Sequence, residues 1–283
     1  MPLQLFDTHT HFDLPEFDAD RSALAQSAVQ QGVQGLVLIG YLAQYFDRLA
    51  AVQQQLQQQK SVQQNVPDTY LAAGLHPFYI LEHQPDDLWR LEQFLQTYAC
   101  VAVGEIGLDT YTDQMKQPSV YQAQQDLFSA QLALAQQFEL PVMLHIRRAH
   151  ADSLAILKRH RFRHGGIAHA FSGGIQEAKA FIQLGFKIGI TGQITDPNAK
   201  KLRNTIQQLV HERGLGDLVL ETDCPDMTPL CCRQPHERHT RNTPANLPHV
   251  LRGLAELVQV SEEVLAAQFW RNTRKCLRLG CGF

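Results

Sequence analysis

The segment LQLFDTHTHFD, residues 3–13, places two histidines two positions apart directly after the first apolar run of the chain. Side chains at positions i and i+2 of a β-strand point to the same side. If strand geometry continues through the segment, His9 and His11 present two imidazoles to one point in space. Such a pair suits a divalent metal, but it is common by chance and needs further ligands elsewhere in the chain.

Short runs rich in apolar and β-branched residues recur along the chain and predict strands. The eight runs are QLFDTH (4–9), VQGLVLIG (33–40), TYLAAGLH (69–76), CVAVGEIG (100–107), PVMLHI (141–146), GGIAHAF (165–171), FKIGITG (186–192) and DLVLETD (217–223). Segments with apolar residues at three- and four-residue spacing separate them and predict amphipathic helices. Strand and helix alternation in 283 residues favours an α/β fold, a single (β/α)8 TIM barrel spanning residues 1–283.

Composition narrows the class of protein. Hydrophobic residues make up 44% of the chain, charged residues 19%, and the net charge is −3, so a broad basic surface for duplex DNA is not expected. The N-terminus has no signal-like pattern, and no window reaches the length of a membrane span, so we expect a cytoplasmic protein without a membrane or an obligate protein partner. None of the six cysteines forms a Cys-X-X-Cys pattern, and a structural zinc site built on cysteine is not expected.

The active site of a TIM barrel lies at the carboxyl ends of its strands. If the fold is a TIM barrel with an active site, we expect chemically active side chains at those ends. Histidine or a carboxylate recurs there: His9 at the end of the first run and His11 two positions beyond it, His76 at the end of the third, Glu105 in the fourth, His145 in the fifth, His169 in the sixth and Asp223 in the eighth. Imidazole and carboxylate without thiolate suit Zn²⁺, Mn²⁺ or Mg²⁺. The set exceeds what one tetrahedral ion needs, which predicts two ions, with the carboxylate of Glu105 between them.

Seven short sequence motifs, in the same order along the chain, are similar to those of a known family. The runs DTHTHFD, GLHP, VGEIGLD, LPVMLHIR, HAFSG, IGITG and LETDCP resemble the TatD family of metal-dependent deoxyribonucleases, within the amidohydrolase-like barrels, from about residue 6 to the C-terminus. The resemblance implies a binuclear centre with two divalent ions. It implies that His9, His11 and Asp223 hold one ion, that His145 and His169 hold the other, that Glu105 bridges them and that His76 lies close to the scissile phosphate.

Other residues receive roles by their position. Asp223 is the expected general base, since a carboxylate on the first ion can reach the attacking water, with a purely ligating role as the alternative. Asp7 is expected to orient one of the neighbouring imidazoles, and Asp109 to fix the loop after the fourth strand. Arg147 and Ser172 follow ligand histidines and are candidate contacts for a phosphate.

Two basic segments differ in their expected place. KRHRFRH (158–164) lies between a helix and the sixth strand, on the barrel face opposite the site. RQPHERHTR (233–241) lies in the Pro-rich connection 224–249 after the eighth strand, on the face of the site, and is the better candidate for guiding a polyanion. A connection of that length without secondary structure predicts a lid or a substrate-binding element.

Three functions remain open at this point. The resemblance implies hydrolysis of phosphodiester bonds in DNA, with single strands or strand ends as the partner and a 3′–5′ exonuclease as the expected form. The alternative is hydrolysis of an ester or amide, such as an aminoacyl-tRNA ester or a cyclic amide. Barrels with such activities often carry a carboxylated lysine on the fourth strand, where this chain has Glu105. The third is a metal-binding protein without catalytic activity.

Overall fold

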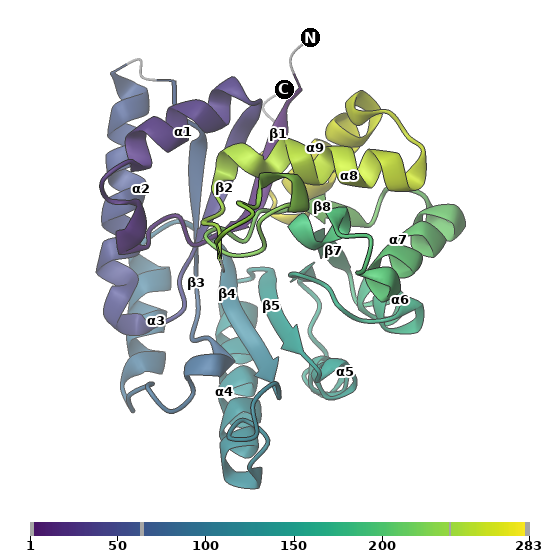
Figure 1. The fold of residues 1–283 in the computed structure, drawn as a ribbon. Coiled ribbons are helices and arrows are strands. Elements are labelled where there is room, and N and C mark those ends of the chain that lie inside the picture. The colour runs from purple at the N-terminus through teal and green to yellow at the C-terminus, as the bar shows by residue number, and fades with distance from the viewer. Residues whose placement is uncertain (1–2, 63–64, 238, 281–283) are drawn as a thin grey trace.

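The computed structural model describes residues 3–62, 65–237 and 239–280. Its strands form one parallel eight-stranded sheet in the order of the sequence, and helices surround it (Figure 1). The strands are β1 (Leu5–Thr10), β2 (Val33–Ile39), β3 (Asp68–Ala73), β4 (Cys100–Asp109), β5 (Val142–Arg147), β6 (Gly166–Ala168), β7 (Phe186–Ile190) and β8 (Leu218–Leu220). Asp223 N donates to His9 O (2.9 Å) and His11 N to Cys224 O (2.8 Å), which joins the end of β8 to β1. The predicted (β/α)8 barrel is confirmed.

Helices follow most strands and cover the outside of the barrel. They are α1 (Arg21–Gln30), α2 (Phe46–Ser61), α3 (Asp87–Thr97), α4 (Pro118–Gln137), α5 (His150–Arg159), α6 (Ile175–Gln183), α7 (Lys200–Arg213), α8 (Leu247–Val258) and α9 (Glu262–Cys276). Short 3-10 turns stand at several strand ends: η1 (Pro15–Phe17), η2 (Ala43–Tyr45), η3 (Pro77–Tyr79), η4 (Gly192–Thr195), η5 (Leu230–Cys232) and η6 (Pro244–Asn246). Among the described residues, no helix is both long and apolar enough to cross a membrane.

The inside of the barrel changes from apolar to polar along the strands. One buried cluster contains Phe6, Val37, Ile39, Ala72, Ala102, Met143, Ile167, Val219 and Leu277. A larger apolar cluster packs between the strands and the helices. On β4, Ala102 precedes Glu105, and on β5, Met143 precedes His145. Because all strands run parallel, the apolar residues form a floor at the amino end, and the polar residues gather above it at the carboxyl end.

Strand lengths differ from those expected. β6 and β8 end early, so His169 and Asp223 stand beyond their strands, although His169 N still donates to Leu144 O on the neighbouring strand (3.1 Å). β4 instead continues to Asp109, and Glu105 lies within the strand and not at its end. The pairing of β4 with β5 shifts by one residue between Val103 and Ile106. Such a bulge turns a side chain toward a new direction.

The connection 224–249 is not structureless, which corrects the expectation from its composition. It contains η5 and η6, and α8 already begins at Leu247. The buried Asn242 amide donates to Thr222 O (2.9 Å) and Asp226 O (2.8 Å). These bonds tie the connection to the end of β8, because a buried amide must find partners for its hydrogens. Residue 238 of the basic segment 233–241 lies outside the described residues.

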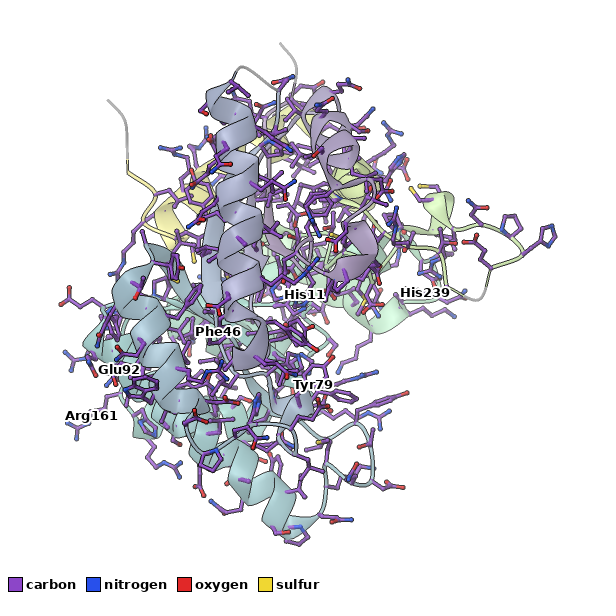
Figure 2. The ribbon with its side chains drawn as sticks, turned by 90° about the vertical axis from the view of Figure 1, so that its left-hand side faces the viewer. His11, Phe46, Tyr79, Glu92, Arg161 and His239 are labelled. Carbon is purple, nitrogen blue, oxygen red and sulfur yellow. The ribbon has the colours of Figure 1, made fainter. Side chains whose placement is uncertain are left out.

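The two basic segments lie on different sides of the molecule. Figure 2 shows His239, in segment 233–241, on a projecting loop at one edge, and Arg161, in segment 158–164, at the opposite edge. His11 lies between them in this view. Arg241 is also engaged, because its guanidinium pairs with Asp20 and donates to Glu16 O (2.6 Å). The segment therefore has less free positive charge than its sequence indicates.

Glycine allows the close approach of β4 and β5 beside the bulge. Gly107 has a φ of +143°, and a Cβ atom there would lie 2.1 Å from His145 O. No side chain fits in that space, and L-residues rarely adopt this φ. Gly107 is therefore required by the backbone geometry that also places Glu105.

We expect Gly107→Ala to lower the free energy of unfolding by roughly 1–3 kcal/mol, because the substitution adds backbone strain and a clash with His145 O. Urea denaturation followed by circular dichroism measures the difference. Gly216→Ala is the matched control, because nothing lies within 4 Å of the added Cβ atom. Equal loss in both variants would contradict the argument.

Candidate metal centre

The buried carboxylate of Glu105 lies at the centre of the polar end of the barrel. Glu105 is 1% exposed, and five imidazole nitrogens surround it. Burial acts to raise the pKa of Glu105, but the imidazoles of His76, His9 and His169 outweigh it and hold that pKa well below its usual value. The carboxylate is therefore ionised, and its negative charge organises the rings around it.

The five rings divide between the two oxygens of Glu105. His9 Nε2 (3.1 Å) and His11 Nε2 (3.5 Å) approach Oε2. His145 Nδ1 (2.8 Å), His76 Nε2 (3.3 Å) and His169 Nε2 (3.8 Å) approach Oε1. A carboxylate flanked on each oxygen by separate nitrogen donors can bridge two ions.

Asp223 lies across from Glu105. Its Oδ1 lies 3.5 Å from His169 Nε2, 3.8 Å from His9 Nε2 and 3.9 Å from His11 Nε2. Burial raises the pKa of Asp223 to about 6, although the neighbouring rings of His169 and His11 act to lower it. The structure thus brings all six expected metal ligands, from both ends of the chain, to one place.

The donor set fits a cation. His11 Nδ1 lies 3.1 Å from Ile39 O and donates its proton there, which directs the other ring nitrogen at Glu105. That nitrogen carries a lone pair when the ring is neutral, and a lone pair facing a carboxylate oxygen is unfavourable without positive charge between them. Burial lowers the pKa of His11, but Glu105 and Asp223 outweigh it and raise the pKa to about 9. The site requires a positive charge at this point, which a proton or a metal ion supplies.

His76 differs from the other rings by its tautomer. Phe78 N donates to His76 Nδ1 (3.0 Å), so this nitrogen is an acceptor. Burial lowers the pKa of His76 to about 4, so the ring is neutral and its one proton resides on Nε2. A protonated nitrogen cannot bind a metal. His76 therefore presents a hydrogen-bond donor to the site.

Two further carboxylates lie close to the ring nitrogens of His145 and His169 that face away from Glu105. Asp109 Oδ2 accepts from His145 Nε2 (2.9 Å), and Glu221 Oε1 lies 3.1 Å from His169 Nδ1. Such carboxylate contacts fix the orientation of a metal-ligating histidine and raise its basicity. Asp109 also accepts from Tyr111 N (2.6 Å), as its expected role in the loop requires, but its contact with the ring was not expected.

Sequence reasoning missed Glu221 entirely and misplaced the role of Asp7. Glu221 stands two positions before Asp223, and this spacing of two was the available signal. Asp7 orients no imidazole: its carboxylate accepts from Thr222 N (2.9 Å) and Thr222 Oγ1 (2.6 Å), while His9 contributes only its backbone N–H (3.3 Å). Asp7 therefore ties β8 to β1.

The centre opens into a cleft of about 380 Å³. The expected substrate contacts Arg147 and Ser172 both line it, together with His76. The Arg147 guanidinium stacks on the exposed ring of Tyr111, 3.4 Å from its centroid. The cleft is thus wide enough for a small organic group and has donors around an acidic centre.

Comparison with known proteins identifies the family. A model of the family described as TatD related DNase matches residues 6–278. The chain belongs to the TatD family. A metal-dependent hydrolase of Escherichia coli K12, YjjV, is 39% identical over 276 residues, which cover 96% of this chain and 97% of that protein. The crystal structure of a TatD homologue of the same name from E. coli K12 superposes with a TM-score of 0.86, at 36% identity, over 99% of this chain and 100% of that one.

A second relative is named for its activity. The 3′-5′ ssDNA/RNA exonuclease TatD of Pantoea ananatis is 32% identical over 277 residues, which cover 97% of this chain and all of that protein. This TatD-family chain is a metal-dependent hydrolase. The histidines and carboxylates around Glu105 form groups that could hold a metal ion.

We expect Mn²⁺ to stabilise the chelator-treated protein, because an ion that binds only the folded state shifts unfolding by about 2.7 kcal/mol at a hundredfold excess over its Kd. Differential scanning calorimetry with and without Mn²⁺ measures the shift in Tm. Glu105→Gln should abolish the shift, since an amide cannot supply two anionic oxygens. The exposed Glu256→Gln should retain it; loss of the shift in both variants, or in neither, would contradict the assignment.

Asp109→Asn should weaken Mn²⁺ binding roughly 10–100-fold. The reason is that the neutral amide replaces the negatively charged acceptor that orients the ring of His145. Calorimetric titration with Mn²⁺ measures the Kd. Asp113→Asn is the control, since Asp113 is exposed in the following loop and pairs with Lys116 (2.8 Å). An unchanged Kd in Asp109→Asn would show that the ring needs no support from this carboxylate.

Proposed function

We propose that this protein hydrolyses phosphodiester bonds in DNA as a 3′–5′ exodeoxyribonuclease acting on single strands or strand ends, with two divalent ions at the centre. The division of the imidazoles between the two oxygens of Glu105 carries the proposal. The activity for which the Pantoea relative is named supports the choice of substrate. A single domain over residues 1–283 and a cytoplasmic location form part of the same proposal.

The ligands follow the division seen at Glu105. We assign His9, His11 and Asp223 to one ion, His145 and His169 to the other, and Glu105 to both. Mg²⁺, Mn²⁺ and Zn²⁺ all suit this set of nitrogen and oxygen donors. Bound there, the ions lower the pKa of a water molecule and stabilise negative charge on the phosphoryl oxygens.

Residues of the chain complete the reaction. Asp223 acts as the general base, because a carboxylate on the first ion lies within reach of the attacking water. His76 donates from Nε2 to a phosphate oxygen, in agreement with its tautomer. Arg147 and Ser172, which line the cleft, hold the remaining phosphate oxygens by charge and by a hydroxyl donor.

An aromatic rim supports a single-stranded substrate. Tyr41 and Tyr79 line the cleft, with ring centroids 5.3 Å apart, and Tyr79 is labelled beside His11 in Figure 2. Tyr45 and Phe78 extend the group to the surface, each 39% exposed. Unpaired bases stack on such rings whatever their sequence, whereas bases in a duplex are already stacked on one another.

The direct test is digestion of one single-stranded DNA oligonucleotide labelled at either end, in Mn²⁺, by the wild type and by Glu105→Gln. We expect the wild type to shorten the strand from its 3′ end, so that a 3′ label is released as a mononucleotide while the 5′-labelled strand shortens stepwise. Glu105→Gln should lose this activity. No cleavage by the metal-loaded wild type would overturn the phosphodiesterase and favour an ester or amide substrate.

Tyr79→Ala should raise the KM for a single-stranded oligonucleotide roughly 5–150-fold, because one stacked base is worth about 1–3 kcal/mol. Tyr79→Phe is the control, since it keeps the ring and removes only the hydroxyl. Steady-state kinetics on both variants separates stacking from hydrogen bonding. A KM equal to that of the wild type in Tyr79→Ala would remove this ring from the binding surface.

A further inference from the structure

A second group of potential metal ligands lies in the connection after β8, outside the centre at Glu105. Cys231 and Cys232 stand in η5, and His249 stands in the first turn of α8. Their ligand atoms all lie within 4.8 Å of one another. All three side chains are exposed or partly exposed, so an ion from solution can reach them.

The distances agree with the edges of a tetrahedral site. The two Sγ atoms are 3.8 Å apart, and Cys231 Sγ lies 3.4 Å from His249 Nδ1. Zinc bonds of about 2.3 Å to sulfur and about 2.0 Å to nitrogen, at tetrahedral angles, give edges of about 3.8 Å and about 3.5 Å. Two of the three edges therefore already match those of a zinc site, and the third, between Cys232 and His249, lies within 4.8 Å.

Both halves of this group are anchored to the barrel. In η5, Leu230 N donates to Thr195 Oγ1 of η4 (2.8 Å), and Cys232 N donates to Pro229 O (2.9 Å). His249 belongs to α8, whose Leu251 and Leu254 are fully buried in the apolar cluster outside the strands. A site on anchored elements keeps its geometry better than one on a loose loop.

We propose that Cys231, Cys232 and His249 bind a third divalent ion, Zn²⁺, as a structural clip at the rim of the cleft. Thiolate and imidazole donors select zinc over Mg²⁺ and Mn²⁺, which prefer oxygen, so this ion differs in kind from those the Glu105 centre accepts. Three protein ligands leave one coordination position for water. The proposal replaces the expectation that no zinc site in this chain is built on cysteine.

The clip would act on the segment that borders the cleft. Pro225, Asp226 and Met227 line the cleft and precede η5, and Gln193 lines it from η4. A bond between η5 and α8 closes the chain between Cys231 and His249, which includes the basic segment 233–241. Closing a loop restricts its unfolded and open conformations. The ion thus stabilises the wall of the substrate cleft.

Cobalt titration tests the proposal independently of nuclease activity. The full-length protein is stripped with chelator, kept reduced with a phosphine, and titrated with Co²⁺, whose bonds to thiolate absorb in the near ultraviolet. We expect the wild type and Glu105→Gln both to show this charge-transfer band, because no expected ligand at Glu105 is a cysteine. The double variant Cys231→Ser, Cys232→Ser should lose the band, and His249→Ala should require more Co²⁺ to reach it.

The double variant Cys100→Ser, Cys276→Ser is the matched control and should retain the band, since both cysteines lie away from η5 and α8. Zn²⁺ should slow proteolytic cleavage within residues 233–237 of the wild type. It should leave the cleavage rate of the double variant Cys231→Ser, Cys232→Ser unchanged. A reduced wild type without the band overturns the proposal. A band that persists without Cys231 and Cys232 also overturns it, because the thiolates must then lie elsewhere.

Discussion

The rest of the site depends on the negative charge of Glu105, which is buried inside the barrel and must be surrounded by donors or cations. Glu105 is almost fully enclosed, and an ionised carboxylate is costly there unless donors or cations surround it. Five imidazoles meet that requirement, and their contacts with Asp109, Glu221 and Ile39 O set how the rings stand. The arrangement attracts positive charge and could hold a metal ion, and the pairing of opposite charges explains why so many polar groups tolerate burial at one end of an apolar barrel.

The parallel strands explain how residues distant in sequence converge. Several strands supply an apolar residue to the floor and, two or three positions later, a polar residue to the mouth, as Ala102 and Glu105 do on β4 and Met143 and His145 do on β5. The bulge between β4 and β5 then turns Glu105 inward from the middle of its strand. The apolar residues that stabilise the barrel thus lie at the amino ends of the strands, and the polar residues lie at the carboxyl ends. The polar residues can therefore face a cleft without exposing the apolar core.

The barrel was predictable because eight apolar runs repeat along the chain. The convergence of histidines and carboxylates at one end was predictable because one or the other recurs near the end of most of these runs. The bulge was not, since no local pattern shows how two strands pair. Glu221 was missed because its spacing of two from Asp223 places the two carboxylates on one side of the strand but does not show which ring Glu221 faces. The group of Cys231, Cys232 and His249 was also missed, since its members meet only when the connection after β8 folds onto α8.

One measurement tests the central claim most directly: anomalous diffraction from crystals soaked in Mn²⁺ and recorded near the manganese absorption edge. The account predicts two peaks beside the carboxylate of Glu105, one within bonding distance of His9, His11 and Asp223, the other within bonding distance of His145 and His169. Occupied manganese sites elsewhere, with no peak beside Glu105, would contradict it.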